Sequence, residues 1–387
     1  MGERITVILG AGASWDVDTG STPRTNPEWH PPLVSNLFEG RETFYDVRRY
    51  YRGAARLGQV LHPRAAAGAL DMEQELRSLA ESDDPVTRRD FLDIPPYLRD
   101  VMYQVGIEAK YLGGNPVGYV VSPGAYALLL HELLVAAGAE VMFVVMNYDT
   151  LLERALWEYD AATYTFNSFE GYIRPERQAK VVKPHGSVDW WAPLRPAVSS
   201  QTWFEALDLV SLEQIRELAK DRHYIRDITS SFNAKLEING QPHWMYPLIT
   251  APLSNKTELD LVCPQEQLDC LASFLTDCQR YLFIGTSGFD ADILSFMADH
   301  MPDSSVAEFV FGGNENKHRI AHNDARDRII KALPSLKGQP VPDKKNSTVG
   351  DTFVDGFASY LLTRRARTLA LNDVQITQTE FHKELRN

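Results

Sequence analysis

The fold is decided by the stretch Ile5-Thr6-Val7-Ile8-Leu9-Gly10-Ala11-Gly12-Ala13-Ser14. Its first five residues are mostly apolar and rich in β-branched side chains, which predicts a buried parallel strand. A strand that breaks at once into Gly-Ala-Gly-Ala-Ser is typical of a phosphate-binding turn, because Gly10 allows the tight turn and Gly12 has no Cβ to keep a pyrophosphate off the backbone. Ser14 offers a hydroxyl to a ligand or to the next helix as a cap. Similar turns also occur in proteins that bind no ligand there, so the prediction of a ligand site depends on other stretches of the sequence.

Length and composition exclude several classes of protein. The chain has 387 residues, of which 44% are hydrophobic and 24% charged, as in ordinary globular proteins of one large domain or two. No apolar run reaches the roughly 18 residues that span a bilayer, and Met1-Gly2-Glu3-Arg4 leads straight into the first strand, so no signal peptide is expected. The net charge of -13 argues against direct nucleic-acid binding, which needs a basic surface.

The three cysteines, Cys263, Cys270 and Cys278, do not have the spacing of paired Cys-x-x-Cys ligands. A structural zinc is therefore not expected, and the site is predicted to hold no metal. Buried thiols fit the reducing cytoplasm, which is the predicted location.

The chain order predicts a sheet interrupted by helical segments. Short apolar runs at residues 140–146, 180–183, 245–250, 280–284 and 306–311 read as further strands. Helical spacing of Met72, Leu76 and Leu79, with Asp71 as N-cap, predicts a helix inside a helical block. The predicted fold class is α/β, a Rossmann-like parallel sheet of about six strands with helices on both faces and a helical insertion. The predicted divisions are residues 1–36 and 113–362 as the Rossmann-like domain, 37–112 as the helical insertion, 188–245 as a lid or interaction region and 363–387 as a tail.

Polar residues follow five of these strands. They are Gly10 to Ser14, Asn147-Tyr148-Asp149, His185-Gly186, Gly285-Thr286-Ser287 and Gly312 to Asn316. Open α/β sheets bind ligands at the carboxyl edge of their strands, so these five ends predict one shared ligand site.

The order of these motifs resembles the sirtuin superfamily: a Gly-Ala-Gly turn, Asn-x-Asp, His-Gly, Gly-Thr-Ser, and an asparagine after the last strand. The likeness is most specific at Met146-Asn147-Tyr148-Asp149 and Lys183-Pro184-His185-Gly186-Ser187. It implies that NAD lies across the carboxyl edge as the substrate. The residues implied to bind it are Gly10, Ala11, Gly12 and Ser14 at the pyrophosphate, Gly285, Thr286 and Ser287 on the phosphate and adenosine side, and Asn314 near the adenosine ribose.

The resemblance also implies catalytic roles. His185 would be the general base, Asn147 would face the nicotinamide ribose, and Asp149 would lie at the nicotinamide end. These residue types suit cleavage of a glycosidic bond through an oxocarbenium-like state, where positioning and charge placement dominate. From the residues alone, a structural histidine at 185 and a helix cap at Asn147 are the alternatives, and the functional interpretation is favoured for both. Asp290 and Asp292 are expected to be charges at a helix N-terminus.

The chain departs from the deacylases of this family, which carry a four-cysteine zinc module and a different loop after the first turn. It looks closer to the bacterial sirtuin-like NAD hydrolases of anti-phage defence. That likeness implies an NAD glycohydrolase that releases ADP-ribose and nicotinamide, a homo-oligomer, and a partner such as a HerA-like ATPase or an Argonaute. The alternatives are an NAD-dependent protein deacylase and a non-enzymatic module that senses NAD or ADP-ribose.

Overall fold

A computed structural model describes most of the chain. The described residues are 3–15, 31–68, 70–111, 124–194, 202–226, 228–253, 256, 261–312, 316–338, 352–353 and 356–362. Within these ranges, none of the helices combines the length and the apolar character that crossing a bilayer requires.

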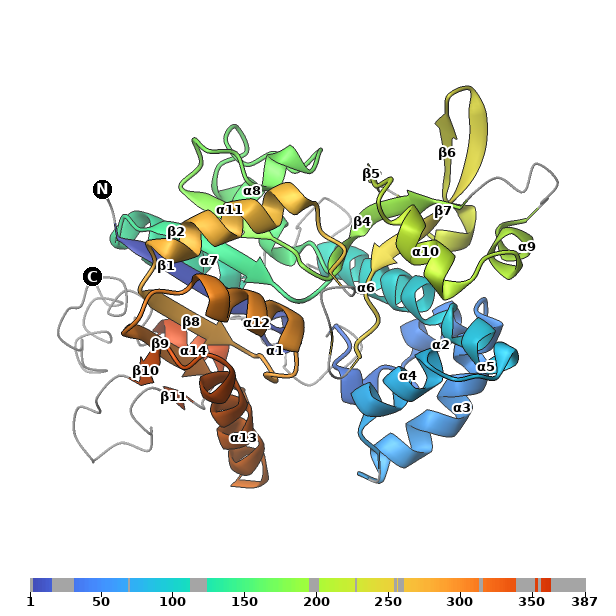
Figure 1. Ribbon diagram of the computed structural model, residues 1–387, viewed down its shortest axis with the longest axis horizontal. Coiled ribbons are helices and arrows are strands. Elements are labelled where there is room, and N and C mark those ends of the chain that lie inside the picture. The colour runs from blue at the N-terminus through green and yellow to red at the C-terminus, as the bar shows by residue number, and fades with distance from the viewer. Residues whose placement is uncertain are drawn as a thin grey trace.

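The larger sheet is entirely parallel, with the strand order β10-β9-β8-β1-β2-β3 and β11 also paired with β9 (Figure 1). Its strands are β1 (Arg4–Leu9), β2 (Glu140–Val145), β3 (Ala179–Val182), β8 (Arg280–Ile284), β9 (Ser305–Val310), β10 (Leu336–Gly338) and β11 (Thr352–Phe353). Leu9 is in register with Val145 on one side and with Ile284 on the other, so β1, β2 and β8 end at the same edge. The predicted Rossmann-like α/β class is confirmed.

Helices cover both faces of this sheet. One face packs against α7 (Gly124–Leu130), the π-helix η3 (His131–Ala136), α8 (Leu151–Tyr159) and α14 (Phe357–Leu362). The other packs against α11 (Gln265–Thr276), α12 (Ala291–His300) and α13 (Asn316–Ala332). Two short elements complete this part of the chain: α1 (Ala11–Trp15) just after β1, and the 3-10 helix η4 (Glu170–Tyr172) between α8 and β3.

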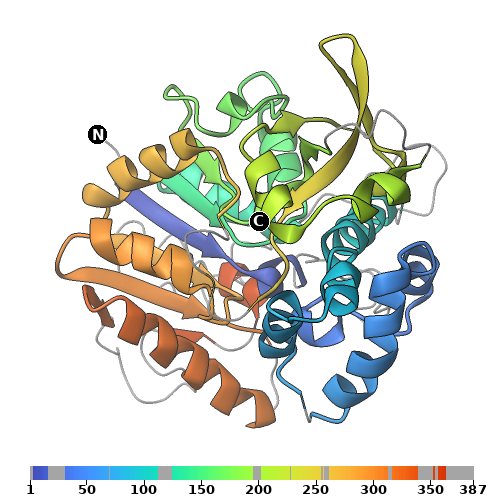
Figure 2. The same cartoon turned by 45° about the vertical axis from the view of Figure 1, so that its right-hand side comes forward.

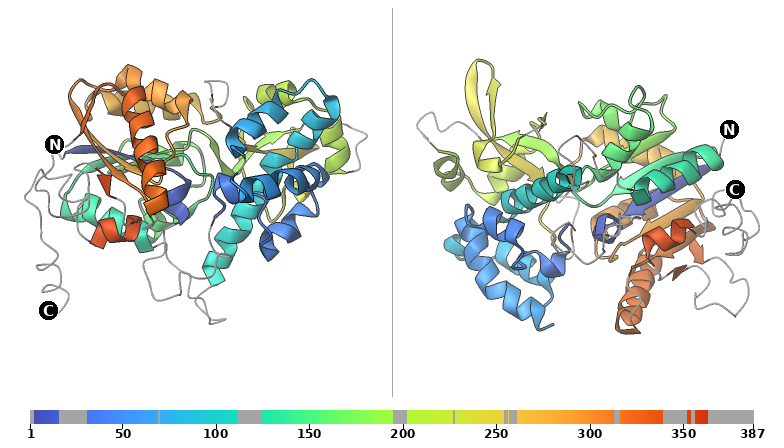
Figure 3. Two further views of the ribbon diagram at one scale, coloured as in Figure 1. Left: turned by 90° about the horizontal axis from the view of Figure 1, so that it is seen from below. Right: turned by 180° about the vertical axis from the view of Figure 1, so that it is seen from behind.

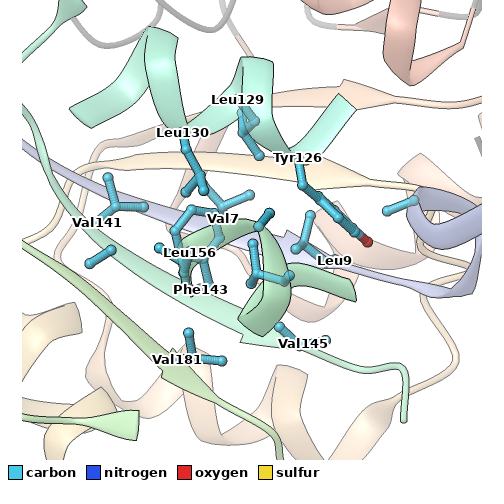
Figure 4. Packing of buried hydrophobic residues seen from close by; sticks show 14 of the residues in the cluster. Val7, Leu9, Tyr126, Leu129, Leu130, Val141, Phe143, Val145, Leu156 and Val181 are labelled. Atoms are coloured by element: carbon cyan, nitrogen blue, oxygen red, sulfur yellow. The ribbon is translucent and has the colours of Figure 1, made fainter. Parts of the chain in front are cut away.

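The strand sequences explain the two covered faces. Side chains alternate along a strand, so both faces must be apolar when both are buried. In β2, Val141 and Phe143 lie in the core under α7 and α8, whereas Met142 and Val144 lie in the core under α11 and α12. Figure 4 shows the first of these cores, where Tyr126 and Leu130 of α7 pack over Val7 of β1.

A second lobe stands at the carboxyl edge of the parallel sheet (Figures 1 and 3). Its helical part contains η2 (Val34–Asn36), α2 (Glu42–Arg48), α3 (Arg52–Ala66), α4 (Met72–Ala80), α5 (Pro85–Phe91) and α6 (Ile94–Tyr111). Its other part contains the antiparallel sheet β5-β4-β7-β6 with β4 (Gly186–Pro193), β5 (His223–Tyr224), β6 (Lys235–Ile238) and β7 (Gln241–Ile249), and α9 (Trp203–Asp208), α10 (Leu212–Leu218) and η5 (Ser231–Asn233). One apolar core joins the two parts: Tyr51, Leu98, Trp203 and Tyr246 all belong to it.

Local predictions hold where the pattern is strong. The helix predicted from Asp71 onward is α4, and the Asp71 side chain accepts a hydrogen bond from the Gln74 backbone N–H at 3.1 Å. The strand predicted at 245–250 exists as part of β7, but it pairs antiparallel with β4 in the second lobe. The sixth strand on the parallel path is instead β10, which is not among the predicted strands. The proposed division at 37–112 and 188–245 stays a prediction, and the tail at 363–387 lies outside the described residues.

Candidate functional site

A cavity of about 470 Å³ opens at the carboxyl edge of the parallel sheet, between this sheet and the second lobe. In Figure 2, the arrow of β1 points toward the helices of that lobe. The residues that line the cavity come from the turns after β1, β2, β8 and β9, from α13, and from the second lobe: Gly10, Ala11, Gly12, Met146, Asn147, Tyr148, Gly285, Thr286, Ser287, Asp290, Phe311, Gly312, Ala325, Arg328, Pro32, Leu33, Val34, Ser35, Leu37, Glu73, Leu98, Met102, Pro252 and Lys256. This is the edge at which open parallel sheets bind ligands.

The two glycine turns pack directly against each other. Gly10 donates its backbone N–H to Ile284 O at 2.9 Å, and Gly12 donates to Gly285 O at 3.1 Å. A Cβ at Gly10 would lie 2.3 Å from Gly285 O. The glycines are therefore required by the backbone packing of the β1 and β8 turns, in addition to any approach of a ligand.

Gly285 gives the clearest stability prediction at this contact. It has φ +61°, and a Cβ there would lie 2.3 Å from Ala13 N, so Gly285→Ala should combine left-handed strain with a backbone clash. Gly240 has φ +77° with nothing within 4 Å, so Gly240→Ala carries the strain alone, about 1–2 kcal/mol. Urea unfolding should show a clearly larger loss for Gly285→Ala than for Gly240→Ala. Equal losses would mean that the two turns are not packed as described.

Asn147 lies at the end of β2 with its amide held on both sides. Its Nδ2 donates to Asp149 Oδ2 at 2.6 Å, and its Oδ1 accepts from the Tyr148 backbone N–H at 3.0 Å. One amide hydrogen and one carbonyl lone pair remain for a ligand, because a primary amide has two of each. Asp149 itself is buried, and its Oδ1 accepts from the Leu151 N–H at the start of α8 at 3.0 Å. Asp149 thus orients the asparagine that lines the cavity.

His185 is buried beneath the cavity floor in a cluster of charged groups. Its Nε2 lies 2.9 Å from Asp292 Oδ2, and its Nδ1 lies 3.3 Å from Lys256 Nζ. The Lys256 ammonium also donates to Asp290 Oδ1 at 2.6 Å. An ammonium can only donate, so Nδ1 is the acceptor in this pair, and Nε2–H donates to the Asp292 carboxylate. Both ring nitrogens of His185 are therefore engaged.

The electrostatics of this cluster follow from burial and ion pairing. Burial acts to raise the pKa of Asp290, but the ammonium charge of Lys256, together with the imidazole of His185, outweighs it and the net pKa is lowered. Burial acts to lower the pKa of Lys256, but Asp290 and Tyr148 reverse this and the net pKa is raised. Both groups stay charged at neutral pH, so the cavity floor presents a tight ion pair.

His185, Asp290 and Asp292 also have the composition of a metal site, with one ligand atom from each lying within 4.8 Å of the others. However, the Lys256 ammonium already donates to two of them. A metal ion would have to displace this buried ammonium group. The side chains of the cluster are therefore better explained as partners of Lys256 than as metal ligands.

The turn after β8 is held by a side chain of α13 and offers an unused donor inside the cavity. Arg328 of α13 donates from Nε and Nη2 to Ser287 O at 3.0 and 2.7 Å. The Thr286 hydroxyl is buried and has no hydrogen-bond partner among the described residues. Because a buried unpaired hydroxyl is costly, it is the kind of group that a bound ligand satisfies.

The structure brings most of the predicted site residues to one place. Seven of them line the cavity: Gly10, Ala11, Gly12, Asn147, Gly285, Thr286 and Ser287. Three are buried behind its lining, namely Ser14, Asp149 and His185. The Ser14 hydroxyl lies 3.0 Å from the Tyr126 hydroxyl, and its contact with a phosphate stays a prediction. Asn314 lies outside the described residues.

Four residues of the site were not predicted as functional: Glu73, Lys256, Asp290 and Arg328. For Asp290 a signal existed, since two aspartates two residues apart directly after a strand-end glycine turn must lie at the sheet edge. No local pattern marks Lys256 or Glu73, because their contacts with the site join segments far apart in the chain.

Comparison with known proteins gives a family match. The family model of the SIR2-like domain matches residues 141–326. No curated protein matches the sequence. Among solved structures, the chain is similar to a mutant Sir2 homologue in complex with 2'-O-acetyl ADP ribose, with 11% identity and a TM-score of 0.38 over 86% of this chain and 93% of that one. It is also similar to a Sir2 homologue–NAD complex, with 11% identity and a TM-score of 0.36 over 99% of this chain and 91% of that one.

The matched range contains Asn147, His185, Lys256 and the turn after β8, and so covers much of the cavity floor. Residues 141–326 of this chain therefore have the sequence pattern of a SIR2-like domain.

Proposed function

We propose that this chain binds NAD in the cavity and hydrolyses the bond between nicotinamide and ribose, releasing nicotinamide and ADP-ribose. The observation that carries the proposal is that both glycine turns and Asn147 line one cavity of about 470 Å³. This volume lies within the range of roughly 300–1,000 Å³ that is usual for cofactor and ligand sites.

The lining suits a molecule with polar and aromatic parts. The turns after β1 and β8 supply backbone groups and the unpartnered Thr286 hydroxyl. Across from them, Leu33, Val34, Leu98 and Met102 form an apolar wall that fits a planar ring. Phosphates and hydroxyls would therefore meet the turns, and a base ring would meet the second lobe.

The chemistry needs positive charge to be stabilised on the ribose as the cationic ring of NAD takes up the bonding electron pair and leaves as neutral nicotinamide. Asp290 keeps its carboxylate ionised at the cavity wall, and Asn147 offers an oriented amide in the same cavity lining. Such preorganised groups account for much of the rate in reactions of this kind. For His185 to act as the general base, Lys256 would have to leave Nδ1, because that lone pair is occupied.

The test is the products formed from NAD by the purified full chain, measured by mass spectrometry. Nicotinamide and ADP-ribose in equal amounts are expected. Intact NAD together with tight binding would favour a sensing module, and release of an acyl group from an acylated peptide would favour a deacylase. A deacylase also needs its peptide to reach His185, where Lys256 now lies.

By analogy with the sirtuin-like NAD hydrolases of anti-phage defence, the chain would act in such a defence system. On that basis the chain would be a cytoplasmic homo-oligomer that depletes NAD when triggered, alone or with a HerA-like ATPase or an Argonaute. Sedimentation of the full chain, with and without such a partner, tests the assembly directly.

A substitution at Thr286 is expected to change the affinity for the ligand without lowering the stability of the protein. Thr286→Val keeps the side-chain shape and removes a buried hydroxyl that has no partner among the described residues, so the unfolding free energy should stay equal or rise slightly. Affinity for ADP-ribose should fall about 10-fold, because a hydrogen bond to a charged group is lost. Calorimetry measures both effects. Thr276→Val, on α11, is the matched control, and unchanged affinity in Thr286→Val would remove Thr286 from the binding site.

A further inference from the structure

Glu73 is a cavity residue that comes from the second lobe. It lies in the first turn of α4, whose Met72 and Leu76 are buried in the core of that lobe. Glu73 is half-buried and lines the cavity together with Lys256, Asp290 and Arg328. Its carboxylate makes no hydrogen bond or ion pair to any residue that the structure describes.

The other acidic and basic groups near the floor are already engaged. His185 accepts at Nδ1 from Lys256 and donates from Nε2 to Asp292. Asp290 is paired with Lys256 at 2.6 Å, which stabilises its ionised form and makes it a weak base. Glu73 and Asp290 are both carboxylates of the cavity lining, and of the two Glu73 is the one without a cationic partner among the described residues.

The surroundings of Glu73 also adjust its proton affinity. Burial and the negative charges of Asp290 and Asp71 raise the pKa of Glu73 to about 7, against the opposing charges of Lys256 and Arg328. A carboxylate with a pKa close to the working pH is well matched to accepting a proton during a reaction.

We propose that Glu73 is the general base that deprotonates the water attacking NAD, so that the helical part of the second lobe completes the catalytic site. The assignment rests on the proposed NAD hydrolysis. The water oxygen forms a bond to C1' of the ribose, and one water proton passes to the Glu73 carboxylate. The bond from C1' to the nicotinamide nitrogen breaks, and its electron pair neutralises the positive charge of the ring. The proton then leaves Glu73 for solvent.

The experiment compares nicotinamide release by wild type, Glu73→Gln and Glu75→Gln across pH 5 to 9. Wild-type kcat should rise with pH and level off above about pH 7, because Glu73 must be ionised to accept a proton. Glu73→Gln should lower kcat about 10²-fold and lose this dependence, with little change in KM. Glu75 lies on the same helix and pairs with Arg64, so Glu75→Gln should keep the wild-type profile.

A second readout does not require turnover. The folded protein holds a proton on Glu73 that the unfolded chain loses above pH 4.5, so this group makes the wild type less stable as pH rises from about 4.5 to 7. Glu73→Gln removes this pH-dependent loss of stability. The difference in thermal unfolding temperature between Glu73→Gln and wild type should therefore grow in favour of the variant from about pH 4.5 to 7 and stay constant above pH 7. Glu75→Gln should show no such divergence.

The outcomes separate the two proposals. Wild-type activity with an unchanged rate and pH profile in Glu73→Gln overturns the role of Glu73 and leaves NAD hydrolysis standing. The absence of nicotinamide release by wild type overturns both. A loss of rate without loss of the pH dependence, or without the divergence in stability, also overturns the assignment, because Glu73 would then act only by position.

Discussion

Replacing His185 with alanine is expected to lower nicotinamide release from NAD by about 10³-fold or more. The imidazole links Asp292 on one side to Lys256 on the other, and Lys256 in turn holds Asp290 at the cavity wall. Its loss disturbs all three charged groups at once. It also leaves Oδ2 of the fully buried Asp292 side chain without its hydrogen-bond donor, while Oδ1 still accepts from the Ile293 N–H.

The controls for this experiment distinguish a chemical role from a structural one. His223→Ala removes a half-buried histidine from β5 of the second lobe and should leave the rate unchanged. His185→Gln keeps an amide that can donate to Asp292 but cannot titrate. If Glu73 is the base, His185→Gln should retain part of the activity and the wild-type pH profile. Full activity in His185→Ala would show that the cluster plays no part in the reaction.

Replacing Asn147 with alanine is expected to lower kcat about 10²–10³-fold, the usual cost of removing one oriented polar group from a site of charge development. The amide is fixed by Asp149 and by the Tyr148 N–H, so its remaining donor and acceptor are aimed before the ligand arrives. Stability should change less than activity, because Asp149 keeps its hydrogen bond from Leu151.

The rate of nicotinamide release measures this effect, with Asn233→Ala as the matched control. Asn233 belongs to η5 in the second lobe, and its amide donates to Ser230 Oγ at 2.9 Å. A fall in kcat for Asn147→Ala alone is expected. An equal fall in both variants would point to a general loss of structure, and no fall in either would exclude Asn147 from the reaction.

The parallel sheet could be predicted because its signals are local. β1 and β8 are apolar on both faces and break into glycine turns, so strand, turn and sheet edge follow from about ten residues each. The antiparallel sheet of the second lobe could not be predicted from local signals. β4 carries Asp189 and ends at Pro193, and β7 contains Pro242 and Pro247, which are unfavourable in strands. Their pairing depends on contacts across the lobe.

The candidate site was predictable in its sheet-edge part only. Asn147 and both glycine turns follow strands directly, so their convergence follows from a parallel sheet. Lys256 lies 71 residues from His185 in sequence, and Asp292 lies 107 residues from it. Nothing local in the sequence indicates that a lysine occupies Nδ1 of that histidine. Glu73 reaches the cavity only because the helical part of the second lobe packs against the carboxyl edge of the parallel sheet.

The most direct test of the account is an experimental structure of the full chain with bound ADP-ribose. The ligand is expected to lie in the cavity, with its phosphates beside Gly10 to Gly12 and Gly285 to Ser287 and its free ribose near Asn147, Asp290 and Glu73. A ligand bound elsewhere on the protein, or a cavity that remains empty at saturating ADP-ribose, would contradict it.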